Sequence, residues 1–197
     1  NWPFLYLKSP TIPGMYLAVL IMILVLSGLA VVFSGGGLSN SSRYIDLFLL
    51  GAAFMLLETR AVTMFALLFG TTWLVNAIVF AGILVAVLLA VEFTRWFNRI
   101  SSTGRVPLPI AYAVLLASLA AVWLVPPASL LTLPTPVRLV VAVGLTFLPV
   151  FTANVIFASR FNDSAQPTTA FGMNLLGAMV GGCLEYLALL TGYQSLI

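Results

Sequence analysis

Long apolar runs, separated by short polar or proline-rich stretches, dominate this sequence and limit what it can fold into. Of its 197 residues, 62% are hydrophobic and 7% are charged. A soluble domain has roughly a quarter charged residues, so this chain has too few charges to cover its surface in water. The sequence therefore predicts an integral membrane protein with the lipid bilayer as its surroundings.

Six of the runs approach the length of about 20 apolar residues that a helix needs to cross a hydrocarbon core of about 30 Å. They cover about residues 13–33, 44–69, 73–97, 108–125, 137–159 and 168–190. Lipid offers no partner to unpaired backbone groups, and the runs are too long for barrel strands, so helices are expected. The predicted fold class is all-α, a polytopic transmembrane helix bundle of about six spans. The four prolines between residues 126 and 136 predict irregular structure there.

Residues 1–12 have the composition of a connector at the membrane interface. Trp2 and Tyr6 stand close to Lys8 and Pro10 in this stretch, and aromatic residues together with lysine are typical of the membrane–water boundary. Asn1 is not an initiator methionine. We therefore expect residues 1–12 to be a connector from an upstream region of a longer polypeptide, followed by a transmembrane bundle over residues 13–197.

Several classes of function are disfavoured by the residue types present. The sequence has no histidine. Histidine-based acid–base catalysis, and the binding of a metal or haem through imidazole, are therefore excluded. Its one cysteine, Cys183, lies in an apolar stretch and is expected to be a small buried residue. The net charge of +3 contains no basic run, so no nucleic-acid partner is expected. We predict no catalytic, cofactor-binding or metal site within this chain.

Four polar residues form a candidate intramembrane cluster: Glu58, Arg60, Asn76 and Glu185. A charged side chain near the centre of a membrane helix costs about 2.5–3.5 kcal/mol on insertion scales, so each charge needs a partner. Glu58 and Arg60 are two residues apart and point to different faces of a helix. By helical rise all four lie in the same half of the bilayer, and Glu185 is the first choice of partner for Arg60. The cluster is either a substrate, ion or proton site or a polar contact that fixes helix packing.

The last apolar run carries small residues at helix-packing spacing. Gly177 and Gly181 form a G-x-x-x-G pair, and Gly172 and Ala178 widen the small-residue surface. Small residues let helix backbones approach closely in lipid. We therefore predict close packing at Gly172, Gly177 and Gly181, either against another helix of this chain or against another subunit.

Three stretches together resemble the C-terminal membrane region of bacterial spermidine-synthase-like membrane proteins. The stretches are Trp2-Pro3-Phe4-Leu5-Tyr6-Leu7, residues 51–76 with Phe54-Met55-Leu56-Leu57-Glu58-Thr59-Arg60 and Phe69-Gly70-Thr71-Thr72-Trp73, and Asn174-Leu175-Leu176-Gly177 with Gly181-Gly182 and Glu185-Tyr186. In that family a soluble domain with the class I methyltransferase fold is fused to transmembrane segments. The resemblance implies a bacterial inner (cytoplasmic) membrane, and it places any nucleoside-cofactor and polyamine site upstream of Asn1.

Three functions follow from these observations. The first is a non-catalytic membrane anchor and assembly region of a spermidine-synthase-like protein, with other membrane helices or subunits as partners. The second is an accessory structural subunit of a respiratory or photosynthetic complex. The third is a transporter segment that uses Glu58 and Glu185, which is disfavoured because the first and last three runs show no evident inverted repeat.

Overall fold

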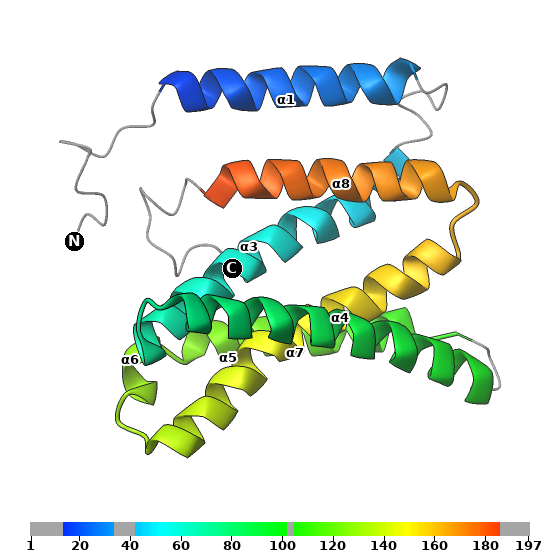
Figure 1. Ribbon diagram of the computed structural model, residues 1–197. Helices are drawn as coiled ribbons and strands as arrows, with labels where there is room; N and C mark the ends of the chain where they lie inside the picture. The colour runs from blue at the N-terminus through cyan, green and yellow to red at the C-terminus, as the bar shows by residue number, and fades with distance from the viewer. Residues whose placement is uncertain (1–13, 34–41, 102–104, 186–197) are drawn as a thin grey trace. The chain divides into compact units, whose positions relative to one another are not determined.

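The computed structural model describes residues 14–33, 42–101 and 105–185, and these residues form helices with no strand among them. This confirms the predicted all-α class, while the expected connector over residues 1–12 lies outside the described residues. The elements are α1 (Gly14–Phe33), η1 (Ser42–Tyr44), α3 (Ile45–Phe69), α4 (Trp73–Ile100), α5 (Leu108–Leu124), α6 (Pro127–Leu130), α7 (Thr135–Asn162) and α8 (Pro167–Leu184) (Figure 1).

Three helical segments are long and apolar enough to cross a membrane, namely Ser42–Phe69, Trp73–Ile100 and Thr135–Asn162. Each has 28 residues, which corresponds to about 42 Å of helix. Shorter apolar helices occur at Leu17–Leu29 and Leu108–Leu124. Many large apolar side chains on these helices are exposed, including Ile21 at 60%, Leu84 at 69% and Leu116 at 66%. Such surfaces are suited to lipid rather than water.

The chain divides into two compact units. Unit 1 contains the residues up to Leu56 and those from Ser164 onward, and unit 2 contains Leu57–Asp163. Helix α3 contributes its first half to unit 1 and its second half to unit 2. The two units are described separately below.

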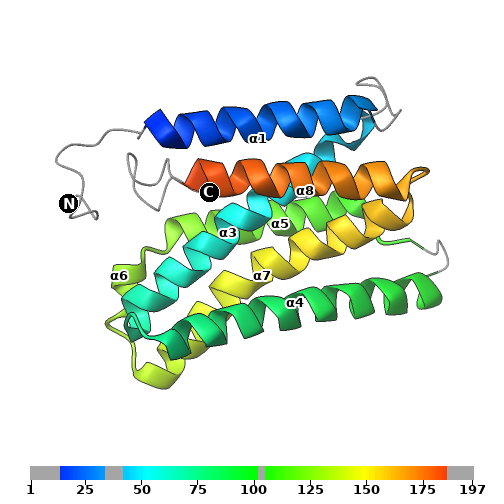
Figure 2. The ribbon, with the colours of Figure 1, turned by 45° about the horizontal axis from the view of Figure 1, so that its top comes forward.

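In unit 1, α1 and α8 run side by side in opposite directions (Figures 1 and 2). The start of α8 is tied to η1 because the backbone N–H of Gln166 donates to the hydroxyl oxygen of Tyr44 at 3.2 Å. Tyr44 is itself buried. This bond fixes the beginning of α8 near the beginning of α3.

In unit 2, α7 lies between α4 and α5 and packs against both (Figure 2). Aromatic rings hold it to its neighbours. Phe147 of α7 meets Phe65 of α3 with ring centroids 5.9 Å apart, and Phe151 of α7 meets Phe93 of α4 at 5.8 Å. Ring pairs at this separation add to the stabilisation that burial supplies.

Turns and caps follow from residue type at two places in unit 2. Gly70 has φ of +97°, a conformation that glycine adopts without strain, and it ends α3. The hydroxyl of Thr72 then accepts a hydrogen bond from the N–H of Val75 at 3.3 Å and caps α4. The proline-rich link is less irregular than the sequence predicts, because Pro127 opens the one-turn helix α6. Proline is favoured at the first helical position, where no N–H is needed.

We expect Gly82→Ala to lower the stability of the protein, because a Cβ at Gly82 would overlap the ring of Phe147. Overpacking costs about 1–3 kcal/mol, of which up to about 1 kcal/mol is offset by the better helix propensity of alanine. Gly144→Ala is the matched control, since a Cβ there meets nothing within 4 Å. Thermal unfolding in detergent should show a lower Tm for the Gly82 variant only. Equal Tm values for both variants would contradict the close contact.

Candidate functional site

The beginning of α3 and the middle of α8 touch through their backbones in unit 1. A Cβ on Gly177 would overlap the carbonyl oxygen of Phe48, and a Cβ on Gly181 would overlap that of Ala52. On the opposite side of the contact, a Cβ on Gly51 would overlap the carbonyl oxygen of Asn174. Three glycines therefore allow the two helices to approach more closely than any side chain permits.

One polar side chain joins the same two helices. The Nδ2 of Asn174 donates to the backbone carbonyl of Leu47 at 3.0 Å, and Asn174 is half-buried. Gly172 differs from the other two predicted glycines, since a Cβ there would meet nothing within 4 Å. Of the predicted packing positions, Gly177 and Gly181 thus lie at the α3–α8 contact, whereas Gly172 has space for an added Cβ.

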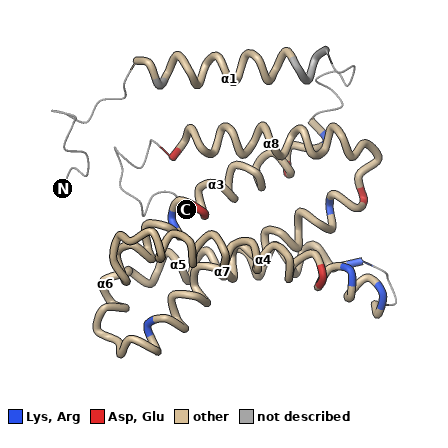
Figure 3. The backbone as a smooth tube through the Cα atoms, viewed as in Figure 1, with Lys and Arg blue, Asp and Glu red and all other residues tan. Residues whose placement is uncertain are grey.

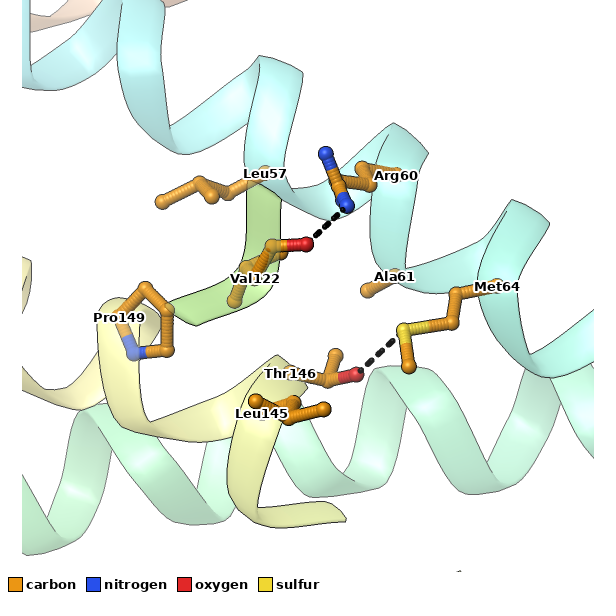
Figure 4. A pocket seen from close by; sticks show the side chains of 8 residues that line it. All are labelled: Leu57, Arg60, Ala61, Met64, Val122, Leu145, Thr146 and Pro149. Carbon is orange, nitrogen blue, oxygen red and sulfur yellow. Dashed lines mark hydrogen bonds between the residues drawn. The ribbon is translucent and has the colours of Figure 1, made fainter. Parts of the chain in front are cut away.

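Arg60 is the buried cation among the described residues of unit 2, with 8% of the residue's surface exposed. It projects from α3 and donates through Nη2 to the backbone carbonyl oxygen of Val122 in α5 at 2.9 Å (Figure 4). A hydrogen bond from a charged donor is stronger than one between neutral groups. Arg60 therefore connects α3 to the last turn of α5.

The prolines after α5 explain why the carbonyl of Val122 accepts this bond. In a continuing helix that carbonyl would accept from the N–H of residue 126, but residue 126 is proline and has no N–H. The guanidinium of Arg60 takes the place of the missing donor. Its positive charge also lies at the C-terminal end of α5, where the helix dipole favours a cation.

A cavity of about 10 Å³ lies beside Arg60 and offers no room for a substrate. Its lining residues come from α3, α5 and α7 (Figure 4): Leu57, Arg60, Ala61, Met64, Val122, Leu145, Thr146 and Pro149. A space of this size holds about one water molecule. The Nη1 atom of Arg60 is buried and has no hydrogen-bond partner among the described residues. On the α7 side, the hydroxyl of Thr146 approaches the sulfur of Met64 at 3.5 Å.

The other predicted cluster residues are placed as follows. Glu58 is half-buried on α3, and Asn76 is exposed in the first turn of α4. Glu185 is half-buried at the end of α8 and belongs to unit 1, whereas Arg60 belongs to unit 2. The pairing of Arg60 with Glu185, and the four-residue cluster as a whole, therefore stay predictions.

No family model, curated protein or solved structure matches this chain. Within the described residues, no group of three or more cysteine, aspartate or glutamate side chains could hold a metal ion. Cys183 is buried there, without a disulfide. The arrangement around Arg60 supports helix packing, because one charged hydrogen bond fixes α5 against α3.

The sequence interpretation did not identify Val122 as the partner of Arg60. A signal was nevertheless present, because Pro126 and Pro127 follow directly after an apolar run. A proline at position i leaves the carbonyl at i−4 without its helical donor. An arginine at matching depth on another helix is a suitable replacement for that donor.

Proposed function

We propose that this chain is a non-catalytic membrane anchor and assembly region of a spermidine-synthase-like membrane protein. In this proposal α1, α3, α4, α5, α7 and α8 are six spans in a bacterial inner membrane. The chain itself carries out no reaction. Its helices hold a larger polypeptide at the bilayer and pack against one another, or against further membrane subunits.

The hydrogen bond from Arg60 to the carbonyl of Val122 is the observation that supports this proposal most directly. A charge inside a membrane helix is by default a candidate for substrate, ion or proton handling. Here the guanidinium bonds to the carbonyl of Val122 at 2.9 Å, beside a cavity of about 10 Å³. A charged group that supports a helix end and faces no substrate-sized space fits a structural role. This favours an anchor over a transporter.

The family part of the proposal is supported by where its motif residues lie. The resemblance rests in part on the segment beginning at Gly51 and on Asn174 to Gly177 with Gly181. In unit 1 these residues form the α3–α8 contact, in which Gly51, Gly177 and Gly181 each face a backbone carbonyl of the other helix. Motif residues that meet at one contact are expected if the motif preserves helix packing.

Gentle purification of the complete natural protein from its own membrane tests the proposal. We expect one polypeptide in which a class I methyltransferase-fold domain precedes Asn1, without respiratory or photosynthetic subunits in equal amounts. Mass spectrometry of the intact protein and of its companions would show both. Stoichiometric subunits of such a complex, with no methyltransferase-fold domain, would overturn the proposal in favour of an accessory subunit.

A further inference from the structure

A second cavity in unit 2, of about 270 Å³, lies where α4 and α7 end and α5 begins. It is large enough for a small polar group, unlike the space beside Arg60. Its lining combines polar residues with an apolar wall at the start of α5: Asn98, Arg105, Ser159, Asn162 and Asp163, then Val106, Leu108 and Pro109. The cavity is therefore amphipathic.

The polar side of this cavity presents both signs of charge. The Nε of Arg105 lies 3.5 Å from Oδ1 of Asp163, with the two side chains 75% and 32% exposed. The lining thus offers one cation and one anion within reach of a ligand in the cavity.

The position of the cavity at the ends of two long apolar helices suits the depth of lipid head groups. Helices α4 and α7 have 28 residues each, so they extend about 6 Å beyond each side of the hydrocarbon core if they are centred in it. Trp96, one turn before the end of α4, is 57% exposed, and tryptophan is enriched at the membrane–water interface. Arg99 lies in the last turn of α4, where Figure 3 shows basic residues gathered.

We propose that this cavity binds the head group of an ethanolamine phospholipid, which pairs a phosphate with a primary ammonium. The guanidinium of Arg105 donates to the phosphate. The ammonium donates to the carboxylate of Asp163, which lines the cavity. The apolar wall at Leu108 and Pro109 accommodates the glycerol end of the acyl chains.

A matched pair of lipids tests the need for an ammonium N–H. Dioleoylphosphatidylethanolamine and dioleoylphosphatidylcholine share phosphate, glycerol and acyl chains, but the choline nitrogen has no N–H to donate. We expect the delipidated protein in detergent to bind the ethanolamine lipid about tenfold more tightly, the order expected for hydrogen bonds to charged groups. Titrated lipid, followed by Tm and by native mass spectrometry, measures this. Equal binding of the two lipids would overturn the proposal, as would preference for phosphatidylglycerol.

Variants that remove a charge from the lining test whether the ethanolamine lipid binds in this cavity. Arg105→Gln and Asp163→Asn should each weaken binding of the ethanolamine lipid about tenfold. Arg99→Gln removes a charge at the same end of α4 but does not line the cavity, so it should bind like the unaltered protein. An equal loss in the Arg99 variant would show a general surface charge effect and overturn the site. Soluble phosphoethanolamine tests whether the ligand is a lipid or a free head group. If it displaced the ethanolamine lipid at equal concentration, the ligand would be the free head group.

Discussion

Replacing Gly177 with alanine is expected to destabilise the protein by about 3 kcal/mol, the upper end of the usual cost of overpacking. The added Cβ would overlap the carbonyl oxygen of Phe48. No change of rotamer can relieve a clash with backbone, so α8 must move away from α3. The hydrogen bond from Asn174 to the carbonyl of Leu47, 3.0 Å long, would then be strained as well. A larger side chain, as in Gly177→Leu, should prevent the α3–α8 contact altogether.

Gly172→Ala is the control for this prediction, because it makes the same change on the same helix. A Cβ at Gly172 meets nothing within 4 Å, so alanine should be neutral or stabilise the helix by up to about 1 kcal/mol. Denaturation of both variants in the same detergent gives the difference in free energy of unfolding. If the Gly172 variant lost as much stability as the Gly177 variant, the glycines would matter for helix backbone conformation and not for the contact with α3.

Replacing Arg60 with methionine is expected to lower the free energy of unfolding by about 2 kcal/mol, within the range for a buried polar group that loses its partner. The carbonyl of Val122 would lose the donor that stands 2.9 Å away, and no N–H from residue 126 can replace it. Methionine keeps much of the apolar stem of arginine, so the loss reports mainly on the hydrogen bond. Unfolding in detergent, followed by circular dichroism, measures it.

A second variant, Pro126→Ala, tests whether Arg60 replaces the backbone N–H that residue 126 lacks. The alanine supplies the backbone N–H that the carbonyl of Val122 lacks, and Val125 is no longer kept out of the helical region by a following proline. In the Arg60→Met background this change should restore at least half of the lost stability. In the unaltered protein it should have little effect, since a carbonyl oxygen can accept two hydrogen bonds. An identical effect of Pro126→Ala in both backgrounds would mean that Arg60 and Pro126 are not coupled.

Helix bounds could be predicted from the sequence at several places because apolar length and breakers act locally. Of the six predicted spans, three correspond to helices that are long and apolar enough to cross a membrane in the described part of the chain. The run predicted over residues 44–69 corresponds to α3, which begins at Ile45 and ends at Phe69 before Gly70. The runs predicted over 73–97 and 137–159 are longer in the structure, where α4 ends at Ile100 and α7 begins at Thr135. Polar residues such as Asn98 and Arg99 continue α4 beyond the apolar run without interrupting its helical hydrogen bonds.

The candidate contacts were harder to predict, because they depend on which face of a helix meets its neighbour. Gly172 and Gly177 look equivalent in sequence, but only Gly177 lies against α3. Arg60 was expected to seek an acidic side chain, whereas its partner in unit 2 is a backbone carbonyl. Every residue has such a carbonyl, so residue type alone does not single one out. The proline four positions later marks Val122 as one of several candidates, because Trp123 and Leu145 also have a proline four positions later.

The bond from Arg60 to Val122 also has a consequence for the order in which the protein is made. Its acceptor lies 62 residues further along the chain, and a ribosome needs about 3–12 s to add that many residues at 5–20 per second. During that interval the guanidinium of α3 has to be kept in contact with water, lipid head groups or the insertion machinery. Arg60 therefore obtains this hydrogen-bond partner only after α5, two elements later in the chain, has been made.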